Sequence, residues 1–111
     1  MTAPTFRVEP DPAALVEVPA AGTLSRTLHA DPDVRVVVFG FAAGEELTEH
    51  TSSRPAVIQV LRGRLELTLA GEPVMAEEGF WVHMDAGLRH AVRAQTPAVM
   101  LLTLLAGGPP G

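Results

Sequence analysis

Turn-forming residues interrupt this chain at short intervals, and no segment between them has the pattern of a helix. Its 111 residues include ten glycines and ten prolines. The segments that these residues separate are rich in β-branched and aromatic side chains, as in VRVVVFGF (34–41) and AVIQVL (56–61). Short segments of this kind, joined by tight turns, are typical of a β-sandwich or a β-barrel. We therefore predict an all-β fold of about nine or ten short strands.

Length and composition suit one folded domain with two irregular ends. With 47% of its residues hydrophobic, the chain is not a disordered polymer. We predict an extended arm over residues 1–14, which are rich in proline and alanine, a barrel domain over 15–106 and a flexible tail over 107–111. Within the domain, strands are expected at 15–18, 22–29, 34–41, 56–61, 65–70, 74–78, 79–84, 89–94 and 96–106.

The expected strands are of two kinds. In 65–69, leucine alternates with Glu66 and Thr68, so one face is buried and the other meets water. Other segments, such as 34–41 and 98–105, are apolar on both faces, and strands of this kind are covered on both sides. One side faces the interior of a small barrel, so the other must meet the arm or another subunit. This pattern predicts a homodimer, because a large exposed apolar patch favours association.

Composition also excludes several classes of function. Eight basic and thirteen acidic residues give a formal charge of −5, so the chain lacks the basic face that nucleic-acid binding requires. The absence of cysteine excludes disulfides, thiolate metal sites and thiol catalysis. The N-terminus has no signal-peptide pattern, and the apolar segment 98–106 is far shorter than the ~20 residues of a membrane span. We expect a cytoplasmic protein with no nucleic-acid or membrane partner.

Glycine and histidine recur at defined spacings in two blocks. His50 lies six positions after Gly44, and Gly63 lies thirteen positions after His50. In the second block, His90 lies eleven positions after Gly79. These spacings resemble the cupin superfamily, whose two motifs run G-x5-H-x-H-x3/4-E-x6-G and G-x5-P-x-G-x2-H-x3-N. The resemblance spans residues 44–94 and implies a single-domain jelly-roll β-barrel of the RmlC-like type.

The resemblance is incomplete at the positions that bind metal. Ser52 stands where the family has its second histidine, and Ala56 stands where it has its glutamate. Of the four metal-holding positions, only His50 and His90 keep ligand side chains. The resemblance implies that these two histidines bind one divalent ion, such as Fe, Mn, Zn or Ni, although such sites usually have at least three protein ligands.

A third ligand would have to come from elsewhere, and His83 is the main candidate, with Gln59, Asp85 and Glu49 as weaker ones. His83 shares one face of strand 79–84 with Trp81, and the sequence leaves open whether that face points inward. The pocket around the two histidines is predicted to be lined by Ser52, Ala56, Ile58 and Trp81.

Two functions remain open at this stage. The chain is a small metal-assisted enzyme acting on a small acidic or carbonyl molecule, or a degenerate cupin that binds a small-molecule ligand without turnover. The motifs do not specify a reaction, because one fold of this kind hosts many activities.

Overall fold

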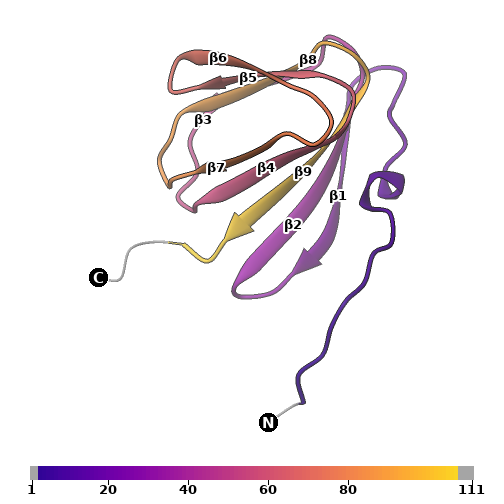
Figure 1. Cartoon of the computed structure of the whole chain (residues 1–111), viewed down its shortest axis with the longest axis vertical. Coiled ribbons are helices and arrows are strands. Elements are labelled where there is room, and N and C mark those ends of the chain that lie inside the picture. Colours follow the sequence, from indigo (N-terminus) through magenta and orange to yellow (C-terminus); the bar gives the residue numbers. More distant parts are fainter. Residues whose placement is uncertain (1–2, 108–111) are drawn as a thin grey trace.

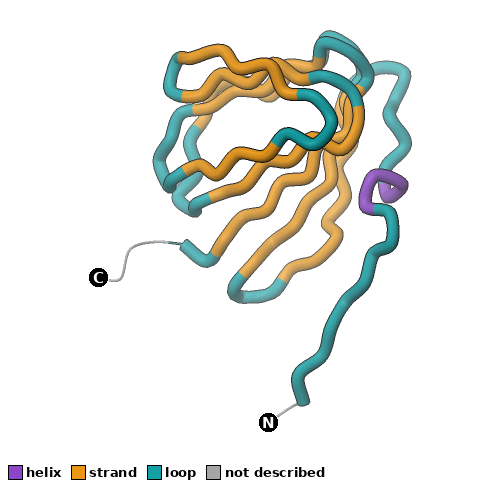
Figure 2. Tube along the Cα trace, in the orientation of Figure 1, coloured by secondary structure: helices purple, strands orange, loops and turns teal. Residues whose placement is uncertain are grey.

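Two antiparallel sheets packed face to face make up the protein (Figure 1), of which the computed structural model describes residues 3–107. The larger sheet contains, in spatial order, β1 (Thr23–Ala30), β2 (Val34–Phe41), β9 (Ala98–Leu105), β4 (Ala56–Arg62) and β7 (Trp81–Met84). The smaller sheet contains β3 (Glu46–His50), β8 (His90–Ala94), β5 (Leu65–Leu69) and β6 (Glu72–Ala76). Among the described residues, the only helical element is the 3-10 turn η1 at Pro12–Leu15 (Figure 2).

The strands pair in a nested order. β2 pairs with β9, β3 with β8, β4 with β7 and β5 with β6, all antiparallel. This nesting is the arrangement of a jelly roll, and the prediction of an all-β fold is confirmed. The prediction of a closed barrel is corrected, because the backbone hydrogen bonds form two separate sheets whose layers meet through side chains.

Apolar side chains that alternate along the strands form the core between the sheets. Ala56, Ile58 and Val60 are buried at every second position of β4. Leu65 and Leu67, from β5 of the smaller sheet, belong to the same buried cluster. Full burial of one Leu or Ile side chain stabilises the fold by about 1.5–3 kcal/mol, so this cluster fixes how the two layers pack.

A second, smaller cluster lies on the outer face of the larger sheet. Ala13 of η1 is buried against Val38 and Val99, with Leu15 and Val16 packed alongside. The predicted strand at 15–18 is therefore wrong, because these side chains pack on the face of the sheet instead of pairing at its edge.

β3 is the strand that the sequence analysis misses. Its sequence, ELTEH, is mostly polar, and only Leu47 packs against the core. An edge strand at the rim of the smaller sheet needs few apolar side chains, so the apolar pattern gives little sign of it. No helix in the part of the chain that the structure describes is long and apolar enough to cross a membrane.

Candidate functional site

His50 and His90 lie side by side at one end of the smaller sheet. They are opposite each other in the pairing of β3 with β8. The centroids of their rings are 4.2 Å apart and the ring planes are inclined by 61°. The structure therefore brings together two histidines that are forty positions apart in the sequence.

Strand alternation points His90 inward. On β8, His90, Val92 and Ala94 are buried, whereas Arg93 between them is exposed. His90 keeps 7% of its surface exposed, while His50 is exposed at the rim. The pair is therefore open to solvent on the His50 side and closed by the core on the His90 side.

A bulge in β3 decides which side chain faces His90. Leu47 pairs with Val92, and uninterrupted antiparallel pairing would then set Glu49 opposite His90. The register shifts by one residue between Leu47 and His50, so His50 takes that place. Such bulges re-aim side chains near functional sites.

The backbone fixes the same tautomer in both imidazoles. His50 Nδ1 lies 2.7 Å from the carbonyl oxygen of Thr48, and His90 Nδ1 lies 2.8 Å from that of Leu88. A carbonyl oxygen only accepts hydrogen bonds, so both Nδ1 atoms must be donors. In the neutral rings, each Nε2 then carries a lone pair that is free to bind a metal ion or to accept a hydrogen bond.

The other predicted pocket residues have structural roles. Ala56 and Ile58 are packed in the core cluster. The Ser52 hydroxyl accepts a hydrogen bond from the backbone N–H of Arg54 at 3.1 Å, and the Ser52 carbonyl accepts one from Gly87 at 2.8 Å. Ser52 therefore shapes the loop after β3, and its side chain is already engaged.

Trp81 and His83 lie on the outer face of the larger sheet. Met84 pairs with Ala56 and both are buried, so the alternate position His83 points away from the interior. Trp81 is 59% exposed, which corrects its predicted place in the pocket. His83 Nδ1 is 3.9 Å from the Asp85 carboxylate, on the surface.

Within the described part of the chain, no carboxylate and no third histidine joins the histidine pair as a possible metal ligand. Between residues 3 and 107, no group of three or more His, Asp or Glu side chains is arranged to hold a metal ion. Glu49, the nearest carboxylate in sequence, lies 3.8 Å from the Arg89 guanidinium in an exposed ion pair. The donor set that the structure offers is thus the Nε2 atoms of two imidazoles.

Sequence reasoning missed the groups that orient these rings. Both acceptors are carbonyls two residues before the histidine, at Thr48 and Leu88. Every residue has a carbonyl, so the sequence contains no signal for them. The bulge in β3 was likewise hidden, because it depends on the pairing with β8.

The jelly-roll fold and the pair of histidines at one end of the smaller sheet are features of one class of small β proteins. A comparison of the sequence with known families assigns the chain to this class. Residues 37–104 match the cupin domain family. The match covers more than half of the chain, so the protein belongs to that family.

Solved structures agree with this assignment. A conserved protein of unknown function, SPY1581 from Streptococcus pyogenes, is 30% identical, with a TM-score of 0.82 over 96% of this chain and 93% of that one. A cupin superfamily protein from Desulfitobacterium hafniense is 24% identical, with a TM-score of 0.81 over 92% and 93%. KdgF from Halomonas is 25% identical, with a TM-score of 0.69 over 76% and 79%. No curated protein matches the chain significantly.

Proposed function

We propose that this cupin binds one divalent metal ion through the Nε2 atoms of His50 and His90, and that a small molecule binds at the same place. The observation that carries the proposal is the fixed tautomer of both rings. Each Nδ1 donates to a backbone carbonyl, so both Nε2 lone pairs remain available at the rim of the interior. Histidines that bind metals typically donate their other ring nitrogen in this way.

The donor set favours particular metals and a loosely held ion. Neutral imidazoles suit Zn, Fe and Ni better than Mg or Ca. Catalytic sites usually have three protein ligands and one open position, so two imidazoles leave more positions for water or for oxygen atoms of a substrate. When bound, the ion would supply Lewis acidity to a carbonyl or carboxylate group.

The two histidines would differ in rigidity and in access to solvent. His90 is buried and set by its strand neighbours, so it is the rigid half of the site. His50 is exposed at the end of an edge strand, on the side from which a ligand must arrive. The exposed Arg89 is paired with Glu49 nearby and would favour an acidic ligand only if that ion pair opens.

A second candidate is a protein that binds a small molecule without metal or turnover. It is supported by Ser52 and Ala56 at the family's ligand positions and by the lack of a third ligand among the described residues. In that case, each Nε2 would accept a hydrogen bond from the ligand or from water.

Metal analysis of the whole chain separates the two candidates. Protein purified without chelator is titrated with Zn²⁺, Ni²⁺ or Mn²⁺ by calorimetry, and bound metal is measured by mass spectrometry. We expect about one ion per chain, lost in His50→Ala and in His90→Ala. His83→Ala and His29→Ala are matched controls, because they remove the same side chain elsewhere on the surface, and they should retain the ion.

Two outcomes would contradict the metal proposal. One is an ion that persists when both His50 and His90 are replaced, and the other is no binding at millimolar metal. The second outcome would favour the metal-free candidate. A crystal soaked with Zn²⁺ offers an independent test, since anomalous density should lie about 2.0–2.1 Å from both Nε2 atoms.

A further inference from the structure

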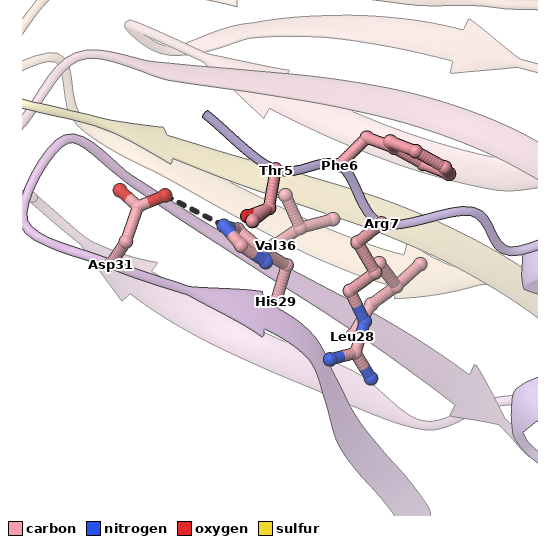
Figure 3. A pocket seen from close by; sticks show the side chains of 7 residues that line it. All are labelled: Thr5, Phe6, Arg7, Leu28, His29, Asp31 and Val36. Carbon is pink, nitrogen blue, oxygen red and sulfur yellow. Dashed lines mark hydrogen bonds and ion pairs between the residues drawn. The ribbon is translucent and has the colours of Figure 1, made fainter. Parts of the chain in front are cut away.

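Arg35 lies at an inward-facing position of β2, and its side chain is exposed. It is opposite Leu104 in the pairing of β2 with β9, and Leu104 is opposite the buried Ala56 of β4. Residues directly opposite each other on antiparallel strands point to the same face. Val36, the next residue, points to the outer face, where it lines the groove beneath residues 5–7 (Figure 3). Arg35 therefore shares the inner face with the core.

Arg35 is the only arginine of the described strands with this facing. Arg26 and Arg62 lie opposite residues of the outer cluster that η1 covers. Arg93 is exposed between two buried residues of β8 and points outward. The chain has no lysine, and none of the ion pairs within residues 3–107 involves Arg35. Its positive charge is therefore available to a ligand on the inner face.

The row of inward residues that contains Arg35 lies at the same end of the interior as the histidine pair. A short loop joins His50 to Ala56. A second short loop joins His90 to Met84, which is the neighbour of Ala56 in this row. Both connections keep the row close to the pair. Two strand spacings, or about 10 Å, separate the Cα atoms of Arg35 and Ala56.

Between Arg35 and the histidine pair, the inner face is apolar and only partly covered. Leu104, which is opposite Arg35, is half-buried, and so is Leu102, the inward residue before it. Further along the same strand, Ala98 and Met100 are fully buried. Figure 1 shows the β1–β2 hairpin extending beyond the smaller sheet. The closed core therefore continues into an open apolar surface, with Arg35 on its far side.

The strand beside Arg35 presents hydroxyl groups on the same face. Ser25 and Thr27 of β1 are exposed and lie opposite the inward residues Phe39 and Val37. The Arg35 guanidinium donates to the Thr27 hydroxyl at 3.4 Å. Arginine offers a planar fork of N–H donors that matches a carboxylate, and a neighbouring hydroxyl supplies one donor more.

We propose that Arg35 is a specificity-determining residue that binds a carboxylate of the small molecule at the histidine site. The ligand class is then an acid with two polar ends. One end binds at His50 and His90, the carboxylate at the other end binds Arg35, and the apolar segment between them lies on Leu102 and Leu104. The inference rests on the proposed binding of a small molecule at the two histidines.

A local positive charge is needed to select an acid in this protein. The formal net charge of −5 repels acidic molecules at long range. Arg89, which lies beside His90 in the sequence, is already paired with Glu49. Arg35 has no such competitor among the described residues, so an acid reaches it without first breaking an ion pair.

Calorimetric titration of the full chain with suberate and with octanoate tests the assignment. The extended length of suberate is of the same order as the ~10 Å between Arg35 and Ala56. Both acids have an apolar segment and one carboxylate, and only suberate has a second carboxylate at the far end. The natural chain should bind suberate about tenfold more tightly than octanoate, because the second carboxylate adds one charge-assisted contact.

Substitution of Arg35 should remove this preference. In Arg35→Gln the two affinities should differ less than about twofold, and Arg35→Lys should keep part of the preference because it keeps the charge but loses the fork. Arg93→Gln is the matched control, since it removes an exposed arginine from the outer face of the smaller sheet, and it should retain the full preference. The melting temperature of Arg35→Gln should match that of the natural chain, because the side chain is exposed.

The possible failures are distinguishable. Equal affinities for the two acids in the natural chain, no binding of either at millimolar concentration, or a preference that survives in Arg35→Gln would each overturn the assignment of Arg35. The variant with both His50→Ala and His90→Ala tests the proposed function separately, and it should weaken binding of both acids. Unchanged affinities in this variant would refute the histidine site, whereas the ratio of the two affinities reports on Arg35.

Discussion

Replacing Gly63 with alanine would show that this glycine serves the packing of the fold. Gly63 joins β4 to β5 and has a φ of +77°. A Cβ atom at this position would lie 2.2 Å from the carbonyl oxygen of Pro97 and 2.9 Å from Ala98 Cα. These neighbours are backbone atoms at the start of β9, so they cannot turn aside as a side chain could. Gly87 is the matched control, with a φ of +85° and no atom within 4 Å of an added Cβ.

Both substitutions place alanine at a left-handed φ, and only Gly63→Ala also brings the new Cβ atom against the backbone of β9. A left-handed φ costs alanine about 1–2 kcal/mol, and a stiffer unfolded chain offsets about 0.4–1 kcal/mol of this. Gly87→Ala should thus lower the free energy of unfolding by about 1 kcal/mol. Gly63→Ala adds the displacement of β9, for which overpacking costs of about 1–3 kcal/mol are typical. Its total loss should be about 2–4 kcal/mol.

Urea unfolding followed by Trp81 fluorescence or circular dichroism measures this difference. With an m-value of about 2 kcal/mol/M, a difference of about 2 kcal/mol separates the two midpoints by about 1 M. Equal midpoints for the two variants would refute the contact argument and leave only the backbone angle as a cause. The metal binding that we propose should be the same in folded Gly63→Ala as in the natural chain, because Gly63 precedes the end of β5 that pairs with Ala94, whereas His90 pairs with the other end of β5.

Three further outcomes follow from single contacts. The hydrogen bonds from His29 and from two backbone N–H groups hold the pKa of Asp31 below its ordinary value of 3.8. The ionised carboxylate therefore stabilises the fold above pH 3.8, and this stabilisation is lost as the pH falls through the lowered pKa. In Asp31→Asn, the melting temperature should depend less on pH below about pH 4 than in the natural chain. Ser52→His supplies an imidazole at the family's second histidine position and should tighten Ni²⁺ binding more than about tenfold by calorimetry. Arg54→Ala removes the bond from Nε to the Leu105 carbonyl, 2.6 Å long, and should lower the unfolding free energy by about 1.5–3 kcal/mol in urea.

The alternation of apolar residues was enough to predict most of the fold. Segment 65–69 alternates leucine with polar residues, and its leucines face the core. Segment 34–41 carries apolar residues at adjacent positions as well, and the sequence required the arm or another subunit to cover its outer side. Ala13, within the predicted arm, packs there against Val38. The docking of Leu15 and Val16 beside it was not predicted, because it depends on a sheet formed by residues far away in the chain.

Of the candidate site, only the two histidines could be predicted from the sequence. Spacing pointed to His50 and His90, which do meet. The facing of Trp81 and His83 was undetermined, because a four-residue strand with apolar residues at Trp81, Val82 and Met84 fits either facing. Pairing with β4 settles it by burying Met84 against the core.

The burial of Ala56 in the core explains why the family's glutamate is absent at this position. Ala56 is 2% exposed, so a glutamate there would place a carboxylate in an apolar layer. An unpaired buried charge is strongly destabilising, and a bound cation would be needed to balance it. With alanine at this position, the chain can pack its core without any metal, and no buried polar side-chain atom of the described residues lacks a hydrogen-bond partner.

Folding and the proposed metal binding would therefore be separable in this protein. An ion held by His50 and His90, as we propose, would stabilise the fold only by mass action, which amounts to about 2.7 kcal/mol at a hundredfold excess over Kd. The bulge in β3 also decides the charge of the proposed site. Without the bulge, Glu49 would face His90, and a carboxylate beside an imidazole would bind a cation as one negative ligand and one neutral ligand. The shift of one residue puts a second imidazole in place of the carboxylate, so an ion bound as we propose would keep its full positive charge toward a small acidic ligand.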